Sequence, residues 1–163
     1  MWKYILTVLV VLLLAAFFMR DTSQPVTAAA EIDIKAPLKA VWQLQTDIGQ
    51  WQKWNADIES IQIDGPVAPG TQFVWKSGGV TIRSTIREME APRLVVWTGE
   101  TIGIKAVHRW QFSSDGDTTH VYTEETFTGF LPWLLPGTMR DAISEALNDG
   151  VRKLKTASEK QDG

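Results

Sequence analysis

The sequence predicts an α+β domain in which a curved antiparallel β-sheet wraps around a long carboxy-terminal helix. Alternating strand-like runs follow one another between residues 58 and 129, with turn residues between them. From Thr138 onward the pattern changes to the period of an amphipathic helix. Two short helices are expected after the first strand. The 163 residues suffice for one such domain and an amino-terminal segment.

The first twenty residues are predicted to meet a membrane. An uninterrupted apolar run extends from Tyr4 to Met19. Its length lies between the apolar region of a cleaved signal peptide, about 7–15 residues, and that of a transmembrane anchor, about 17–25. Both alternatives stay open, and a buried core helix is the third.

The charges around this run predict where the domain lies. Lys3 and the terminal amine are positive, whereas Arg20 and Asp21 cancel, so an anchor keeps the amino terminus in the cytoplasm. The domain is then membrane-anchored and extracytoplasmic. It is secreted or periplasmic if the segment is cleaved, for example at the alanines of residues 28–30. The expected boundaries are 1–20 for the transmembrane anchor or signal segment, 21–30 for a polar linker and 31–160 for the ligand-binding domain.

A strand and a helical stretch open the domain. In "EIDIKAP", Ile32 and Ile34 alternate with charged residues, as in a half-buried strand. Pro37 suits the first turn of a helix. Apolar residues at helical spacing continue to Ile48, as one helix or as two short helices broken near Gly49.

The middle of the chain is predicted to be an antiparallel meander. Gly78-Gly79 and Asp115-Gly116 stand between alternating runs and are strong hairpin signals. The strand-like segments are "IESIQID", "TQFVWKS", "VTIRSTIREME", "RLVVWTGE", "IGIKAVHRWQF" and "THVYTEETFTG".

The last predicted element is a helix from Thr138. Thr138 with Asp141 three residues later approximates a capping box. The helix extends for about 20 residues, roughly 30 Å, which crosses a whole sheet. Gly150 within it costs about 1 kcal/mol relative to alanine, so we expect a bend or a close neighbour there. The apolar stripe consists of Met139, Ala142, Ile143, Ala146, Leu147, Val151 and Leu154.

Pairing across the Gly78-Gly79 turn assigns the inner face of the sheet. If Ser77 pairs with Val80, residue 75 faces residue 82 and residue 73 faces residue 84. Arginines and threonines occupy the opposite face, which is therefore expected to be exposed to solvent. The inner side chains of this hairpin are Phe73, Trp75, Val80, Ile82, Ser84 and Ile86.

The same rule applied at Asp115-Gly116 places Phe112 opposite Thr119 and His108 opposite Thr123. Glu125 then lies one diagonal step from His108. The inner side chains of this hairpin are His108, Trp110, Phe112, Val121, Thr123, Glu125 and Phe127.

His108 and Glu125 form the most informative polar pair, because burying either alone costs about 1–3 kcal/mol. They satisfy each other or a water in a packed core, or they anchor a ligand in an apolar pocket, or they act as an acid and a base. The sequence offers no nucleophile or oxyanion donor beside them. They are candidates for catalysis without an assigned role.

The tryptophans have two interpretations as well. Trp75, Trp97 and Trp110 either fill a core or line a cavity. We expect Trp51 and Trp54, three residues apart in "DIGQWQKWNADI", to plug the end where the short helices meet the sheet.

The segment "TGFLPWLLPG" carries more apolar side chains than solvent should see. It either folds over the cavity beside the final helix or dips into the bilayer, with Trp133 at the interface.

Composition excludes several classes of function. The formal net charge is -3 with no basic cluster, which excludes nucleic acid as a partner. The absence of cysteine excludes disulfides, thiolate zinc sites and cysteine nucleophiles. We expect no cofactor and no metal.

The order of several segments resembles the START-like, or SRPBCC, superfamily, and within it members of the polyketide cyclase/dehydrase and lipid-transport type. The resemblance covers Glu31 to Glu159 and implies a helix-grip fold with a hydrophobic cavity. It implies no single activity and no catalytic residues. A membrane segment departs from many small soluble members and favours a lipidic ligand. The segments are "IKAPLKAVWQLQTDIGQWQKWNADI", "PGTQF", "RLVVWTG", "AVHRWQF", "THVYTEETFTG" and "LNDGVRKLKTASE".

Three functions follow as hypotheses. The first is a membrane-tethered binding or carrier domain for a lipid, fatty acid, isoprenoid or aromatic polyketide, with His108 and Glu125 orienting the ligand. The second is a cyclase, dehydratase or hydrolase that uses this pair as acid and base. The third is a protein-interaction module without a ligand. The expected ligand contacts are Phe73, Trp75, Ile82, Ser84, Ile86, His108, Trp110, Phe112, Thr123, Glu125 and Phe127.

Overall fold

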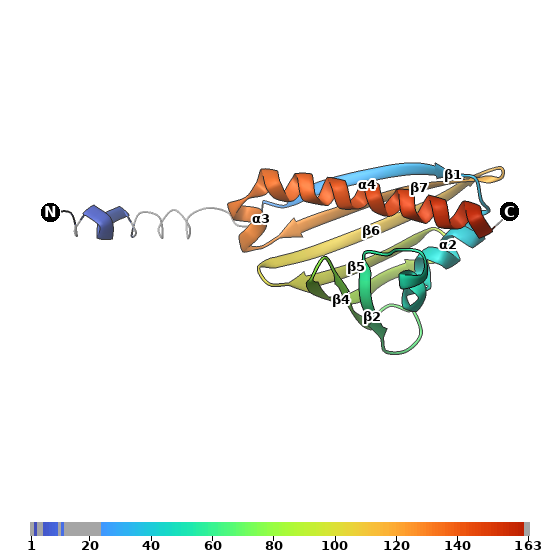
Figure 1. Ribbon diagram of the computed structural model, residues 1–163, viewed down its shortest axis with the longest axis horizontal. Coiled ribbons are helices and arrows are strands. Elements are labelled where there is room, and N and C mark those ends of the chain that lie inside the picture. Colours follow the sequence, from blue (N-terminus) through green and yellow to red (C-terminus); the bar gives the residue numbers. More distant parts are fainter. Residues whose placement is uncertain (1, 3–4, 10, 12–23, 162–163) are drawn as a thin grey trace.

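The computed structural model describes residues 2, 5–9, 11 and 24–161. Residues 24–161 form one sheet, one long helix and three short helical elements (Figure 1). The elements in chain order are β1 (Val26–Ile34), α2 (Leu38–Thr46), η1 (Ile48–Lys53), β2 (Ile58–Ile63), β3 (Gln72–Ser77), β4 (Val80–Glu90), β5 (Leu94–Thr101), β6 (Ile104–Asp115), β7 (Thr118–Thr128), α3 (Phe130–Leu134) and α4 (Pro136–Gln161).

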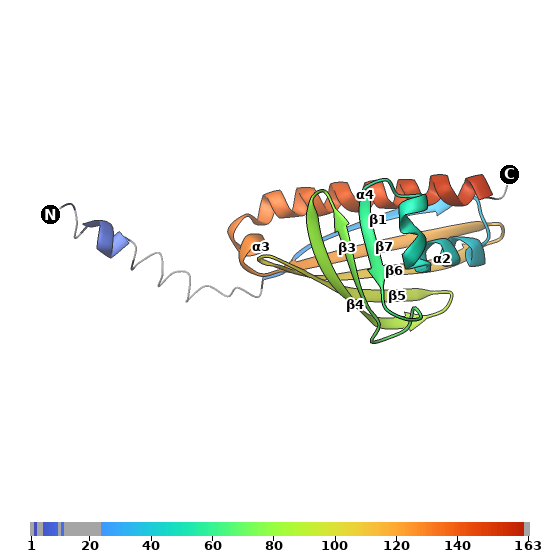
Figure 2. The ribbon, with the colours of Figure 1, turned by 60° about the horizontal axis from the view of Figure 1, so that its bottom comes forward.

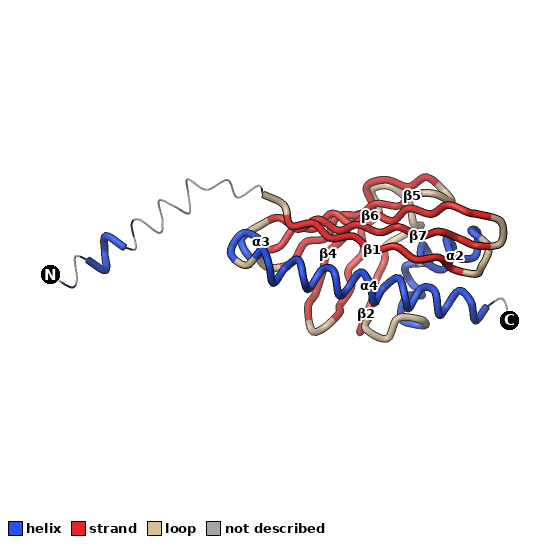
Figure 3. Tube along the Cα trace, turned by 90° about the horizontal axis from the view of Figure 1, so that it is seen from above, coloured by secondary structure: helices blue, strands red, loops and turns tan. Residues whose placement is uncertain are grey.

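The sheet is antiparallel throughout and has the strand order β1-β7-β6-β5-β4-β3-β2. It curls strongly, so β2 to β4 stand apart from β1 and β7, and α4 extends along the sheet (Figures 2 and 3). The predicted α+β class and the wrapping of the sheet around the last helix are confirmed.

The long helix α4 packs an apolar stripe against the sheet. Its 26 residues extend about 39 Å at 1.5 Å per residue. Ile143, Leu147, Val151 and Leu154 are buried at helical spacing. The helix begins at Pro136, so Thr138 lies inside it rather than at the predicted cap. Proline suits the first turn of a helix because its ring fixes φ near the helical value, and because an N–H at this position would have no partner within the helix.

The first strand is longer than predicted. It begins at Val26, so residues 26–30 of the expected linker pair with β7 instead. Burial alternates along the whole strand, with Val26, Ala30 and Ile34 inside. The consecutive alanines at 28–30 hide this alternation in the sequence, because inner and outer positions carry the same side chain.

Two short helices follow β1, which was one of the two predicted alternatives. The break lies at Asp47, between α2 and η1, and not at Gly49. Trp51 in η1 is buried, and its indole ring makes edge contacts with Phe73 and Trp75. Its Nε1 donates a hydrogen bond of 2.8 Å to the Gln45 carbonyl. Trp51 therefore closes this end of the sheet, as expected.

The register of one hairpin is confirmed and that of the other is corrected. Ser77 pairs with Val80 across Gly78-Gly79, as predicted. In the second hairpin, Asp115 pairs with Thr118, so the turn residues are Gly116 and Asp117. Gly116 has a φ of 60°, which suits the first position of a turn that needs glycine there. Every predicted partner therefore moves by two residues, and His108 lies opposite Glu125.

The predicted membrane segment lies mostly outside the described residues. Of the residues that are described, none belongs to a helix with the length and apolar character needed to cross a bilayer. The described side chains between Ile5 and Val11 are exposed, so they do not form part of the core. That residues 4–19 form a membrane segment stays a prediction.

Candidate functional site

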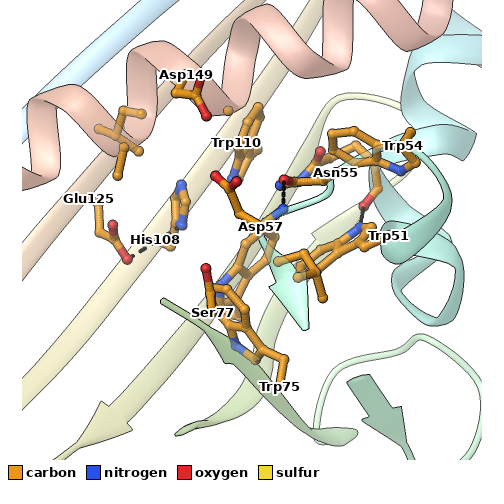
Figure 4. A pocket seen from close by; sticks show the side chains of 16 residues that line it. Trp51, Trp54, Asn55, Asp57, Trp75, Ser77, His108, Trp110, Glu125 and Asp149 are labelled. Atoms are coloured by element: carbon orange, nitrogen blue, oxygen red, sulfur yellow. Dashed lines mark hydrogen bonds and ion pairs between the residues drawn. The ribbon is translucent and has the colours of Figure 1, made fainter. Parts of the chain in front are cut away.

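A cavity lies between the inner face of the sheet and α4, next to the end that η1 closes (Figure 4). Its volume is about 160 Å³. Helix α2, the segment from η1 to β2, strands β3, β5, β6 and β7, and α4 all contribute to its wall. The lining residues are Gln45, Trp51, Trp54, Asn55, Asp57, Ile58, Trp75, Ser77, Trp97, His108, Trp110, Glu125, Ala146, Leu147, Asp149 and Gly150.

His108 and Glu125 form a cross-strand pair in the cavity wall. They lie directly opposite each other on β6 and β7, and His108 Nδ1 is 3.5 Å from Glu125 Oε1. Their side chains are only 13% and 17% exposed. Burial lowers the pKa of His108 to about 3 and raises the pKa of Glu125 to about 8. The pair therefore carries no net charge at neutral pH.

Neighbouring hydrogen bonds set the tautomer of His108. The hydroxyl of Thr123 donates to the Arg109 carbonyl at 3.1 Å, so its oxygen accepts from His108 Nε2 at 2.9 Å. The Nδ1 atom is then an acceptor that faces the protonated carboxyl of Glu125. His108 and Glu125, the two groups identified from the sequence, thus lie together in the wall, with His108 Nδ1 facing the Glu125 carboxyl.

The buried pair makes the stability of the domain depend on pH. The folded-state pKa of Glu125 is raised, so its contribution is complete below pH 4.5 and is lost as pH rises through 8. The pKa of His108 is lowered, so its contribution is complete above pH 6.5 and is lost as pH falls through 3. The two changes cancel between pH 4.5 and 6.5.

We therefore expect the unfolding free energy to be level from pH 4.5 to 6.5 and to fall by about 2 kcal/mol between pH 6.5 and 8, at about 1.4 kcal/mol per pH unit. The variant Glu125→Gln should show no such fall above pH 6.5. Urea unfolding of both proteins at several pH values measures this difference. Parallel curves for the two proteins above pH 6.5 would contradict the assignment.

Charged residues surround the mouth of the cavity. Lys153 Nζ lies 2.5 Å from Asp57 Oδ2 and 2.5 Å from Asp149 Oδ2. Lys153 and Asp149 belong to α4, so the ion pair with Asp57 links the turn before β2 to the helix. The hydrogen bond from Lys153 holds the pKa of Asp149 below its usual value. Arg152 Nη2 also lies 3.5 Å from Asp149 Oδ1, so two carboxylates and two cationic side chains flank the entrance.

Gly150 leaves the entrance open. A Cβ atom added to it would meet nothing within 4 Å. Of the two alternatives predicted at this glycine, a bend or a close neighbour, the close neighbour is wrong, because open space lies there instead. The missing side chain widens the cavity where α4 passes over it.

The structure brings only part of the expected ligand contacts to the cavity. Trp75, His108, Trp110 and Glu125 line it. Two of the others bond a lining side chain: Ser84 accepts a hydrogen bond from Trp75 Nε1 at 3.1 Å, and Thr123 bonds His108. Phe73 packs against Trp51 and Trp97, and Phe112 packs against Trp42. The remaining three, which lie elsewhere on the sheet, are Ile82, Ile86 and Phe127. Val80, expected inside, is 45% exposed at the hairpin end.

Several lining residues were not expected from the sequence. Gln45 comes from α2, Asn55 and Asp57 come from the turn after η1, and Asp149 and Gly150 come from α4. They meet only because the sheet curls. The only sequence feature that pointed to this part of the wall was the pair Trp51 and Trp54, which we expected to plug the end of the sheet.

A curved sheet that holds one long helix over a partly open pocket, lined mainly by apolar side chains, defines a helix-grip domain, a class of ligand-binding fold. The chain belongs to the polyketide cyclase/dehydrase and lipid transport family, whose model matches residues 25–159. This confirms the resemblance of the sequence. None of the curated proteins matches the chain.

Solved structures show the same fold at low sequence identity. A START superfamily protein from Mycobacterium smegmatis has a TM-score of 0.72 and 15% identity, over 83% of this chain and 98% of that one. A hypothetical protein from Helicobacter pylori has a TM-score of 0.70 and 18% identity, over 88% and 93%. A norcoclaurine synthase from Thalictrum, solved with a transition-state analogue, has a TM-score of 0.69 and 9% identity, over 85% and 97%. These likenesses establish the fold alone.

Proposed function

We propose that this domain binds a hydrophobic small molecule in the cavity beneath α4 and serves as a binding or carrier domain. The observation that carries the proposal is a hollow of about 160 Å³ walled by five tryptophans and roofed by α4. Protein interiors are normally close-packed, so a space of this size beside a gap at Gly150 is unusual for a core. Family membership supports an apolar ligand.

Mass spectrometry of organic extracts tests this proposal. The full chain, purified in parallel with Gly150→Phe, should carry an enriched small apolar molecule that the variant lacks. Equal extracts from both proteins, together with no binding of single-ring or double-ring hydrocarbons to the wild type, would contradict it.

A second candidate function is an enzyme that exchanges a proton with its ligand. The supporting observation is the series of Glu125, His108 and Thr123 in the cavity wall, in which Glu125 Oε1 lies 3.5 Å from His108 Nδ1 and His108 Nε2 bonds the Thr123 hydroxyl. A carboxyl with a pKa of about 8 holds a proton at neutral pH and is able to release it. Recovery of the bound molecule unchanged after long incubation favours the carrier, whereas a changed mass that Glu125→Gln abolishes favours the enzyme.

We further propose that the apolar run of residues 4–19 tethers the domain to a membrane. The described apolar side chains at one tip of the domain support it. Ile102 is 93% exposed in the turn between β5 and β6, and Phe130, Leu134 and Leu135 are about half exposed on and after α3. Leu131 N bonds the Gly103 carbonyl, so the turn and α3 are adjacent. β1 enters at this same end (Figure 1).

The orientation of the domain follows from this tether. Since the chain has no cysteine, Ile102→Cys and Asp117→Cys each accept one polarity-sensitive fluorophore, and Asp117 lies in the turn at the opposite end. In liposomes of phosphatidylcholine with some phosphatidylglycerol, the label at 102 should shift to shorter wavelength and the label at 117 should not. Equal emission from both labels would contradict the tip's contact with lipid.

A further inference from the structure

One lysine connects two walls of the cavity at its mouth. Lys153 on α4 donates to Asp57 in the turn before β2, and it also pairs with Asp149 one helical turn earlier. Both aspartates line the cavity. Figure 4 shows Asp149 on α4 and Asp57 across from it on the other wall. The contact between Asp57 and Lys153 therefore crosses the mouth.

The strands of the wall offer a ligand no passage. Strands β5, β6 and β7 are joined by continuous ladders of backbone hydrogen bonds, so a molecule cannot pass between them. Within the described part of the chain, no backbone hydrogen bond joins residues 54–57 to α4. On this stretch of α4, a Cβ atom at Gly150 would meet nothing within 4 Å. A molecule that reaches the cavity therefore passes between this turn and α4.

A single polar contact links the turn to α4. Within the turn, Asn55 Oδ1 accepts a hydrogen bond from Asp57 N at 3.1 Å, and Asn55 N donates to the Trp51 carbonyl at 2.8 Å. These bonds fix Asp57 within its own turn. Among the residues that the structure describes, no other hydrogen bond or ion pair joins residues 54–57 to α4. The contact with Lys153 therefore determines how closely the turn approaches the helix.

This contact is able to break without leaving a charge unpaired on the helix. Asp149 and Lys153 are four residues apart on α4, in the favourable order for an ion pair, so Lys153 keeps a partner when Asp57 moves away. Arg152 also stays paired with Asp149. The Asp57 side chain is 58% exposed, so water solvates its carboxylate. Exposed ion pairs are weak and are screened by salt, so the contact opens readily and depends on ionic strength.

We propose that the contact between Asp57 and Lys153 is a gate: a ligand enters and leaves the cavity when this contact breaks, and ionic strength sets how often it breaks. This inference rests on the proposed binding function and adds the route of exchange and its regulation. The gate acts on the rates of entry and exit rather than on the choice of ligand.

Fluorine NMR of fluorobenzene exchanging with the full chain tests the gate. The cavity of about 160 Å³ is close in volume to one of about 150 Å³ that binds benzene. Asp57→Asn keeps the size of the side chain and removes its charge. At low salt, we expect this variant to take up and release fluorobenzene about two- to fivefold faster than the wild type, with an unchanged Kd, because an exposed ion pair is lost.

Salt and a second variant separate the gate from a general loosening of the domain. Raising the salt from about 0.01 M to about 1 M shortens the screening length from about 30 Å to about 3 Å. The exit rate from the wild type should rise to that from Asp57→Asn, whose own rate should not change. Glu59→Gln is the control, because it breaks an exposed ion pair with Lys76 that does not reach α4, and Glu59 does not line the cavity. It should exchange fluorobenzene as the wild type does.

Amide hydrogen exchange supplies a readout that needs no ligand. The amides of Trp54 and Asn55, which bond the Trp51 carbonyl, should exchange faster in Asp57→Asn than in the wild type. Thermal unfolding of each variant controls for folding. Equal exit rates for Asp57→Asn and the wild type at low salt, or equal acceleration by Glu59→Gln, would refute the gate while binding in the cavity stands. If fluorobenzene does not bind the wild type and no molecule co-purifies, the binding function fails and the gate fails with it.

Discussion

Replacing Trp51 by alanine should destabilise the domain by about 3–5 kcal/mol, the range for removing a large aromatic side chain from a core. Trp51 is 5% exposed, and its ring centroid lies within about 6 Å of those of Phe73, Trp75 and Trp97. Its loss leaves a void between η1 and the strands β3 and β5, and it removes the bond to the Gln45 carbonyl. Urea unfolding monitored by circular dichroism measures the change.

Trp54→Ala is the matched control for this experiment. Trp54 lies three residues later but is only half-buried, and its Nε1 makes no bond within the described structure. Its replacement should cost less than half as much as that of Trp51. Equal losses would show that Trp51 does not close the end of the sheet as described.

Gly150→Phe should abolish binding of an apolar molecule while the domain stays folded. The new side chain extends from α4 into the open space at the cavity mouth. Phenylalanine is a better helix former than glycine, so the unfolding free energy should change by less than about 1 kcal/mol. The affinity for toluene, measured by titration, should fall by at least about tenfold, which corresponds to 1.4 kcal/mol.

The other open glycine of α4 supplies the control. A Cβ atom at Gly137 also meets nothing within 4 Å, and Gly137 does not line the cavity. Gly137→Phe should therefore bind toluene as the wild type does. A loss of binding in both variants, or in neither, would contradict entry beneath Gly150.

The sequence predicted the fold well because its signals are local. Alternation of apolar side chains in the strands, the Gly78-Gly79 turn and the stripe of α4 each depend on near neighbours in the chain. The start of β1 was missed because three alanines in succession carry no alternation. The β6–β7 register was missed by two residues because either Asp115-Gly116 or Gly116-Asp117 is able to form the turn.

The site was harder to predict because it depends on distant contacts. A two-residue shift in register preserves the face of each strand, so His108 and Glu125 were identified together despite the error. Gln45, Asp57 and Gly150 belong to three separate elements, and only the curl of the sheet unites them. The role of Gly150 depends on space that its side chain does not fill, which no local pattern reveals.

The tryptophans themselves supply the most direct test of the cavity. The full chain contains eight, and each indole N–H gives one signal in a two-dimensional ¹H–¹⁵N spectrum. Titration with toluene should shift the signals of the lining residues and leave those of Trp42, in the core, and Trp133, in α3, unchanged. The lining tryptophans are Trp51, Trp54, Trp75, Trp97 and Trp110. Shifts confined to Trp42 and Trp133, or no shift at all near toluene saturation, would contradict the account.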